Sequence, residues 1–284
     1  MASVLVTGST GFIGGYVVEA LLGRGYSVIA SARSAGHATD KSWFHKVRFI
    51  SFDFQDYRDE VDYYQYFGCP DAMIHLAWEG LPRYKESFHI TENLPRHLSL
   101  LGNMIRHGLR DLTVTGTCME YGMREAECRE DMDCNPDIPY PKAKHELYKA
   151  LDVLCREKSI AFRWIRLFYM YGKGQNPNSL FSQLDKALAE SAGQFNMSPG
   201  DQKRDFLPVE KVAEYIVTIA MQKNILGIVN CCSGKPVTVR QFVEDYVQAS
   251  GKKIKLNPGF YPYSDIEPMS FWGNTDKLYS ILHS

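Results

Sequence analysis

The stretch Val4-Leu5-Val6-Thr7-Gly8-Ser9-Thr10-Gly11-Phe12-Ile13-Gly14 predicts a strand that turns directly into a helix. Gly8, Gly11 and Gly14 stand between a short apolar run and the helical pattern of Phe12–Leu22. Glycines so placed allow a tight turn, a close approach to a pyrophosphate, and tight packing of helix on strand. The free N–H groups of the helix would then hold the phosphates. We expect a dinucleotide-binding unit here, and a glycine-rich turn without a ligand is the alternative.

Strand-like and helix-like segments alternate through the first half of the chain. Alternation of this kind predicts a parallel sheet with helices on both faces. Helical patterns occupy Thr91–His107 and Lys142–Glu157. The predicted strands are Ser3–Thr7, Ser27–Ala32, Val47–Phe52, Ala72–Ala77, Asp111–Thr115 and Ala161–Leu167.

The second half is less regular, with helical patterns at Leu180–Ala192, Val209–Met221 and Val239–Ser250. We therefore expect an α/β protein with a Rossmann-type doubly wound parallel sheet and a smaller, interleaved C-terminal substrate lobe. The sheet domain would comprise residues 1–168, with residues 205–238 returning to it. Residues 169–204 and 239–284 would form the substrate-binding lobe.

Composition excludes several classes of protein. The 284 residues carry 32 Lys+Arg and 33 Asp+Glu, a net charge of −1, which argues against sequence-independent nucleic-acid binding. No apolar run is long enough to cross a bilayer, and the first residues lack a secretory pattern. The 7 cysteines and 8 histidines are scattered, so neither a disulfide framework nor a metal site is expected. These features predict a cytoplasmic protein with no membrane partner.

A second motif, Tyr140-Pro141-Lys142-Ala143-Lys144, opens a predicted helix. Residues four apart share one helical face, so Tyr140 and Lys144 can point at one site. Tyrosine is a poor acid–base catalyst at neutral pH. We expect the ammonium, with a positive nicotinamide ring, to lower the pKa of Tyr140 toward a useful range.

The end of the second predicted strand bears on the choice of nucleotide. An acidic residue there would bind the adenosine ribose of NAD, but the chain has Ser31-Ala32-Arg33. A guanidinium can engage a 2′-phosphate in a bidentate manner. The sequence therefore favours NADP(H), and NAD(H) with a solvated Arg33 is the alternative.

Together the two motifs resemble the extended short-chain dehydrogenase/reductases, specifically the nucleotide-sugar epimerase/dehydratase group, along nearly the whole chain. Met73–Ala77 resembles the family's fourth strand, and Thr115–Gly122 the segment that supplies the catalytic hydroxyl. Lys203–Val209 resembles the segment whose arginine holds the sugar diphosphate, and Asn274–Leu278 the closing motif.

The resemblance implies functions for the residues at matching positions. The catalytic residues would be Thr117, Tyr140 and Lys144. The cofactor-binding residues would be Gly8, Thr10, Gly11, Phe12, Ile13, Gly14, Ser31, Arg33, Asp53, Phe54, Leu76, Ala77, Asn93, Tyr140 and Lys144. The substrate-binding residues would be Trp78, Thr117, Met119, Asn176 and Arg204.

Some of these residues have plain structural alternatives. Asp53 could cap a strand end rather than bind adenine, and Trp78 could belong to the core. Arg204 could form a surface ion pair with Asp201 or Asp205.

Departures from the family patterns narrow the reaction. Nucleotide-sugar 4,6-dehydratases carry an Asp-Glu pair directly after the catalytic hydroxyl, where this chain has Cys118 and Met119. Epimerase-reductases that make GDP-fucose use a cysteine where this chain has Met119. Hydride transfer assisted by Thr117, Tyr140 and Lys144 remains.

We therefore expect an NADPH-dependent oxidoreductase that reduces the 4-keto group of a nucleoside-diphosphate-linked 4-keto-6-deoxyhexose. Its product would be a deoxysugar donor for polysaccharide, such as O-antigen, or glycoside biosynthesis. A nucleotide-sugar 4-epimerase with tightly bound NAD, and a non-catalytic NAD(P)-sensing protein of the same fold, are the alternatives. The resemblance also implies a homodimer formed through Thr91–His107 and Lys142–Glu157.

Overall fold

A seven-stranded parallel sheet forms the centre of the protein, whose computed structural model describes residues 2–283. The order of the strands is β12-β7-β5-β4-β1-β2-β3. Their bounds are Ser3–Thr7 (β1), Ser27–Ala32 (β2), Arg48–Ser51 (β3), Ala72–His75 (β4), Asp111–Thr117 (β5), Ala161–Leu167 (β7) and Gly227–Cys231 (β12). The edge strand β12 had no counterpart among the predicted strands, and β5 extends two residues beyond its predicted end, to Thr117, which was predicted to be catalytic.

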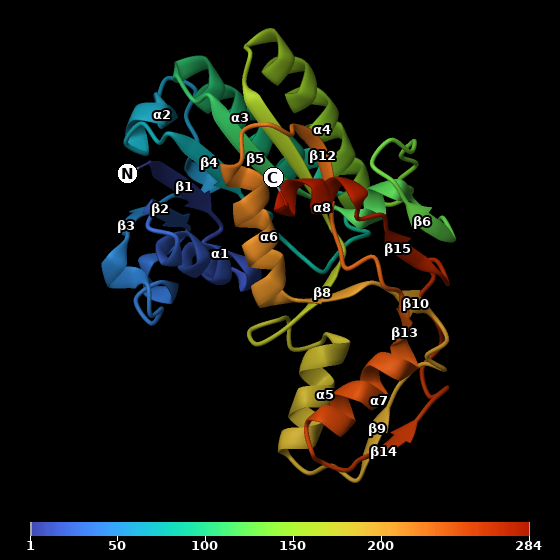
Figure 1. Ribbon diagram of the computed structural model, residues 1–284. Coiled ribbons are helices and arrows are strands. Elements are labelled where there is room, and N and C mark those ends of the chain that lie inside the picture. Colours follow the sequence, from blue (N-terminus) through green and yellow to red (C-terminus); the bar gives the residue numbers. More distant parts are fainter. Residues whose placement is uncertain (1, 284) are drawn as a thin grey trace.

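Helices cover both faces of the sheet, as the alternation of elements predicted (Figure 1). On one face α1 (Phe12–Gly23) packs against α6 (Val209–Met221), and α6 against α8 (Asp276–Leu282). On the other lie α2 (Tyr63–Tyr66), the π-helical turn His89–Asn93 with α3 (Leu94–His107), and α4 (Pro139–Glu157). The helices α3 and α4 pack against each other, and the homodimer through them stays a prediction.

Alternating side chains of the strands divide the core into two layers. In β1, Val4 and Val6 pack toward α1 and α6, whereas Leu5 packs toward α3 and α4. All three are fully buried. This two-sided burial explains why β1 contains the uninterrupted apolar run Val4–Val6.

A smaller lobe lies below the sheet and contains α5 (Leu180–Ala189) and α7 (Val239–Ala249) (Figure 1). Its separate apolar core includes Leu184, Phe195 and Phe242. The remaining strands are short pairs: β6 (Ala126–Cys128) with β15 (Phe271–Gly273), β8 (Tyr169–Tyr171) with β11 (Phe206–Pro208), β9 (Gln194–Asn196) with β14 (Lys255–Asn257), and β10 (Lys203–Arg204) with β13 (Val237–Thr238).

The last helix departs from the expected division of the chain. Residues 239–284 were all expected in the lobe, but Leu278 and Ile281 of α8 lie in the same core as Val17 and Ile216. The chain therefore returns to the sheet a second time. The apolar face of α8 packs against α6 and β12.

The glycines of the first turn set how closely α1 approaches β1. Gly8 has φ +70°, and a Cβ there would lie 2.9 Å from the backbone of Ala77, just beyond β4. A Cβ on Gly14 would overlap the carbonyl oxygen of Gly8. Both positions require glycine because backbone fills the space of a side chain.

Replacing Gly14 with alanine should therefore destabilise the protein. We expect Gly14→Ala to lower the free energy of unfolding by about 1–3 kcal/mol, because the new methyl group forces α1 away from β1. Gly23→Ala, in the last turn of the same helix with no atom within 4 Å of its Cβ, is the matched control. It should be neutral or stabilising by up to about 1 kcal/mol. Equilibrium urea unfolding measures both, and equal effects would contradict the packing argument.

Candidate active site

The site lies at the carboxyl ends of the parallel strands, where the chain changes direction across the sheet. From β1 it passes to β2 and β3 on one side, and then to β4, β5 and β7 on the other. In open α/β sheets ligands bind in the crevice at this switch point. Two neighbouring cavities open there, and Leu76, Trp78 and Leu81 contribute to the walls of both.

The first cavity has the walls expected of a dinucleotide site. It begins at the glycine turn and ends beside β4. Its lining residues are Thr7, Gly8, Thr10, Gly11, Ser31, Ala32, Arg33, Phe52, Phe54, Leu76, Ala77, Trp78, Glu79, Gly80 and Leu81. The glycine turn lies in this wall immediately before α1, whose first N–H groups can bind a pyrophosphate. The rest of the wall fits the adenosine of a dinucleotide.

Several predicted cofactor residues do not line this cavity. Gly14 is buried in the packing of α1 on β1, and Phe12 is not part of either wall. Asp53 accepts the N–H of Gln55 at 2.9 Å and caps the short helical turn Phe54–Asp56, whereas its expected alternative was to cap a strand end. Asn93 is buried and donates to the carbonyl of Glu79 at 3.0 Å. Asn93 therefore holds the loop that forms the wall.

The second cavity brings together the three predicted catalytic residues. Thr117 ends β5, and Tyr140 and Lys144 lie one turn apart at the start of α4. The other lining residues are Ile13, Leu76, Trp78, Leu81, Tyr84, Thr115, Gly116, Cys118, Met119, Leu167, Phe168, Tyr169, Met170, Gln175 and Glu267. The predicted residues Ile13, Trp78 and Met119 are thus in this wall, next to the trio.

Lys144 is held by two contacts. Its Nζ donates to the carbonyl of Thr115 at 2.9 Å and lies 4.2 Å from the centre of the Trp78 ring. Burial lowers the pKa of Lys144 to about 7, and the charge of Glu120 opposes this effect. Lys144 is therefore partly charged and partly neutral near neutral pH.

Tyr140 differs from the expectation. Burial raises its pKa above the ordinary value, Tyr84 and Glu120 add to the increase, and only a hydrogen bond with Thr117 lowers it. Lys144, whose own pKa is lowered by burial, is not among the groups that lower the pKa of Tyr140. Tyr140 is therefore held as a phenol, the form that donates a proton.

Trp78 serves both the core and the cavity walls. Its Nε1 donates to Nδ1 of His89 at 3.1 Å, and its ring stacks on His97 with centres 4.6 Å apart. On the far side of His97 a buried chain continues through His75 to Thr7, with hydrogen bonds of 2.8 Å. Burial lowers the pKa of His75 to about 3, so this chain is neutral and fixes Trp78 without adding charge.

Arg33 is paired rather than free. Its Nη1 lies 3.2 Å from Oε1 of Glu79, on the same cavity wall, and Arg96 lies 3.8 Å from the other carboxylate oxygen. Ser31 is buried, and its carbonyl accepts from Ser9. Strand β2 has no acidic residue at its end, but Glu79 from the loop after β4 places a carboxylate on the same cavity wall.

Two of the predicted substrate-binding residues, Arg204 and Asn176, do not line the second cavity. Arg204 is buried and pairs at 3.2 Å with Glu267, not with Asp201 or Asp205. Tyr169 donates to the same carboxylate at 3.1 Å, so Glu267 stands between Arg204 and the cavity. Asn176 is exposed and turned into its own loop, where it accepts from the N–H of Asn178.

Several lining residues were missed by sequence reasoning. Gln175 occupies the wall in place of its neighbour Asn176, and Tyr84 touches Tyr140 with ring centres 5.4 Å apart. The loops that carry these two residues lack periodicity, so the sequence did not indicate which of their side chains face the cavity. Glu267 lies in the Pro- and Tyr-rich stretch, whose path could not be predicted from its composition.

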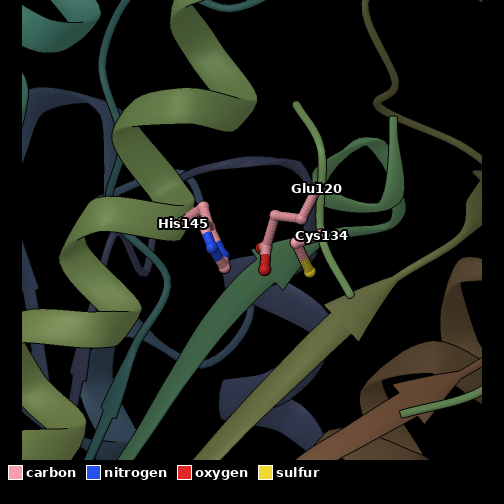
Figure 2. Close-up of side chains that lie close together, drawn as sticks. All are labelled: Glu120, Cys134 and His145. Atoms are coloured by element: carbon pink, nitrogen blue, oxygen red, sulfur yellow. The ribbon is translucent and has the colours of Figure 1, made fainter. Parts of the chain in front are cut away.

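Glu120, Cys134 and His145 lie close together and form a possible metal cluster (Figure 2). It does not fit a cation, because Arg166 already occupies it. The guanidinium donates to Glu120 at 3.0 Å and to Sγ of Cys134 at 2.8 Å. Burial also raises the pKa of Cys134 to about 11, so the thiolate that would bind a metal is disfavoured.

Comparisons with known proteins agree with this geometry. Residues 4–232 match the model of the NAD dependent epimerase/dehydratase family. The chain is similar to dTDP-6-deoxy-L-talose 4-dehydrogenase (NAD(+)) of Aggregatibacter actinomycetemcomitans, with 30% identity over 95% of this chain and 99% of the relative. It is also 24% identical to an uncharacterized UDP-glucose epimerase of Bacillus subtilis (strain 168), over 99% of this chain and 92% of the relative.

Solved structures confirm the Rossmann-type fold. MoeE5 in complex with UDP-glucuronic acid and NAD has a TM-score of 0.82 and 24% identity, covering 99% of this chain and 93% of that one. UDP-glucuronic acid 4-epimerase from Bacillus cereus, in complex with UDP-glucuronic acid and NAD, has a TM-score of 0.84 and 22% identity, with coverage of 99% and 93%. No helix within residues 2–283 has the length and apolar character to span a bilayer. The chain belongs to the NAD dependent epimerase/dehydratase family.

Proposed function

We propose that the protein transfers hydride between NAD(H) and C4 of a nucleoside-diphosphate-linked 6-deoxyhexose. In the biosynthetic direction it reduces the 4-keto sugar to a deoxysugar donor. The observation that carries the proposal is the convergence of Thr117, Tyr140 and Lys144 on a cavity that adjoins the dinucleotide cavity. This convergence also disfavours a non-catalytic sensing protein, which has no use for an acid–base trio.

Each member of the trio has a task in reducing a carbonyl. A bound nicotinamide dinucleotide supplies the hydride. Tyr140, kept protonated by burial, donates a proton to the oxygen of the carbonyl. Thr117 holds that oxygen by a hydrogen bond, and the Lys144 ammonium stabilises the negative charge that Tyr140 acquires. The largely apolar walls around the trio strengthen each of these interactions.

The character of the cavity supports a 6-deoxy sugar. Beside the trio lie Met119, Phe168 and the thiol of Cys118, which together offer an apolar surface to a methyl group. The 30% identical relative is named for a dehydrogenase that acts at C4 of a dTDP-linked 6-deoxyhexose. We take dTDP-linked sugars as the first substrates to test.

The proposed cofactor is NAD(H), not the NADP(H) that the sequence favoured. Arg33 was the reason to favour the phosphorylated form, but Glu79 neutralises it on the cavity wall. A carboxylate accepts hydrogen bonds from ribose hydroxyls and repels a 2′-phosphate. The same relative is named for NAD(+), which supports this choice.

A panel of nucleotide sugars tests the reaction. We expect NADH oxidation with dTDP-linked 4-keto-6-deoxyhexoses, NAD⁺ reduction with the matching 6-deoxyhexose, and little turnover of UDP-glucose. NADH absorbance and product stereochemistry by NMR measure the outcome. Interconversion of UDP-sugars by protein that purifies with bound NAD, without net redox, would establish the 4-epimerase instead.

Removing the proton donor should stop turnover while leaving the fold intact. We expect Tyr140→Phe to lower kcat by ~10²–10⁴-fold, the usual contribution of a positioned acid, with little change in the Kd of NADH. Tyr148→Phe, two turns along the same helix and outside the cavity, is the control and should retain activity. Steady-state kinetics and calorimetric titration separate chemistry from binding, and an active Tyr140→Phe protein would falsify the proposed role.

Removing the charge of Glu79 should shift cofactor preference. We expect Glu79→Gln to raise kcat/KM for NADPH by about tenfold, because Arg33 is released and a repelling charge is lost. The control is Glu92→Gln, which also pairs with Arg96, at 3.0 Å, but does not line the cavity. Steady-state kinetics with NADH and with NADPH measure the cofactor preference of each variant. A wild-type protein that already prefers NADPH contradicts the assignment of Glu79.

A further inference from the structure

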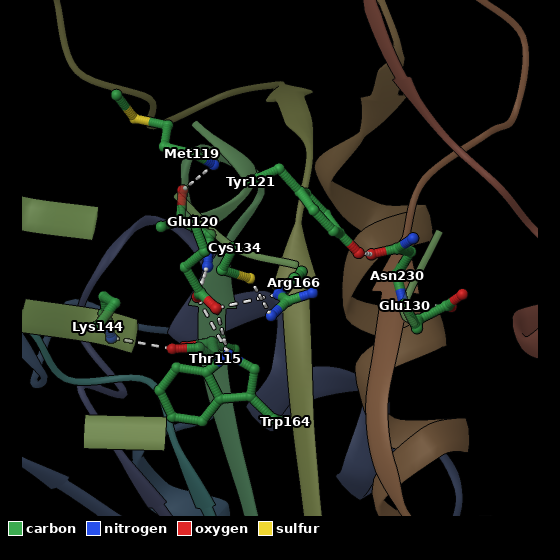
Figure 3. Close-up of polar contacts among 11 residues, drawn as sticks. Thr115, Met119, Glu120, Tyr121, Glu130, Cys134, Lys144, Trp164, Arg166 and Asn230 are labelled. Atoms are coloured by element: carbon green, nitrogen blue, oxygen red, sulfur yellow. Dashed lines mark hydrogen bonds and ion pairs between the residues drawn. The ribbon is translucent and has the colours of Figure 1, made fainter. Parts of the chain in front are cut away.

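A fully buried carboxylate lies directly behind the catalytic threonine. Glu120 has no exposed surface and belongs to the short helical turn Cys118–Tyr121 that follows β5. Its oxygens accept from the N–H of Thr117 at 2.8 Å. They also accept from Nε1 of Trp164 and from Nε of Arg166, both at 3.0 Å (Figure 3). The carboxylate therefore ties the end of β5 to two side chains of β7.

Arg166 completes the network from the next strand. It is 1% exposed, donates to Sγ of Cys134 and lies 4.4 Å from the centre of the Tyr121 ring. A buried charge persists only when it is paired and hydrogen-bonded. Glu120 and Arg166 thus form one unit, and removing either partner leaves the other charge unmatched.

The backbone of β5 is shaped to admit this unit. A Cβ on Gly116, the residue before Thr117, would overlap both Oε1 of Glu120 and Nε1 of Trp164. Only glycine leaves space for the carboxylate beside the strand. Thr117 also accepts the N–H of Met119 at 3.3 Å, so the turn and its carboxylate cap each other.

Glu120 also acts on the charges of the site. Lys144 faces the carbonyl of Thr115 on β5, the ring of Trp78 in the loop after β4, and Tyr140 on its own helix. Three histidines also lie near it, and burial lowers the pKa of each, so they are neutral: His75, His89 and His97. Of the charged groups around it, Glu120 is the one that raises the pKa of Lys144 against the effect of burial. A negative charge behind the trio favours the ammonium form.

We propose that Glu120 is a positioning residue for hydride transfer: its carboxylate, locked by Arg166, fixes Thr117 at the end of β5 and places a negative charge behind the trio. The inference rests on the proposed function of the trio. Glu120 touches neither cavity, so it acts only through Thr117 and through its charge.

Glu120→Gln tests the proposal, because glutamine keeps the size and an acceptor oxygen but removes the charge. We expect kcat to fall by ~10–100-fold, as for a displaced catalytic group, with KM for NADH nearly unchanged. The alkaline fall in kcat should also move to lower pH, because Lys144 then loses its proton more easily. Glu120→Asp, which keeps the charge, should retain the wild-type pH profile at a reduced kcat.

A second buried ion pair on the same two strands is the matched control. Asp111 of β5 pairs with Arg163 of β7 at 2.6 Å, at the opposite end of the sheet from the trio. Asp111→Asn should lower Tm without moving the pH profile. If Glu120→Gln behaves like Asp111→Asn, losing Tm alone, Glu120 is merely structural and the proposal is wrong.

Two further results keep the inference distinct from the proposed function. If Glu120→Gln does not fold, the double variant Glu120→Leu with Arg166→Leu removes both charges together. A folded double variant with wild-type kcat overturns the inference, and a kcat lowered by ~10–100-fold supports it. Full activity of Tyr140→Phe would instead overturn the proposed function itself.

Discussion

The close contact between Gly8 and the backbone of Ala77 sets the position of everything at the site. It brings the end of β1 against the chain leaving β4, at the point where the two halves of the sheet diverge. From this contact the glycine turn faces one cavity, while Trp78, one residue beyond Ala77, forms the wall between that cavity and the next. A side chain at Gly8 would separate the two strand ends, and the two cavities would no longer adjoin.

Burial then determines the chemistry of the groups that these strands present. Tyr140 and Lys144 lie on the first turns of α4, yet both are nearly inaccessible because Trp78 and Tyr84 close over them. Desolvation keeps the tyrosine protonated and brings the lysine close to neutrality, so the two groups move in opposite directions from their free values. The surrounding histidines stay neutral and contribute shape and hydrogen bonds, which leaves Glu120 to balance the charge of Lys144.

The sequence predicted the features that depend on local order, and it failed where distant segments meet. The strand–glycine–helix pattern, the parallel sheet and the one-turn spacing of Tyr140 and Lys144 follow from periodicity and sterics within a few residues. The partner of Arg33, however, comes from a loop 46 positions away, and no local pattern indicates that Glu79 would turn back to it. Asn176 and Gln175 show the same limit at closer range, because a loop without periodicity does not reveal which of two adjacent amides faces the cavity.

The groups around the second cavity, which holds Thr117, Tyr140 and Lys144, also limit which reactions are possible there. Elimination or epimerisation at a carbon acid needs a base that can remove a proton from carbon. Cys118 is a poor candidate, because burial and the charge of Glu267 raise the pKa of its thiol well above the usual value. Among the described residues that line this cavity, Glu267 is the one carboxylate, and Arg204 and Tyr169 already engage both of its oxygens. In the proposed reaction Tyr140 exchanges its proton with the oxygen at the carbon that gains or loses hydride, while Nζ of Lys144 is engaged by the carbonyl of Thr115.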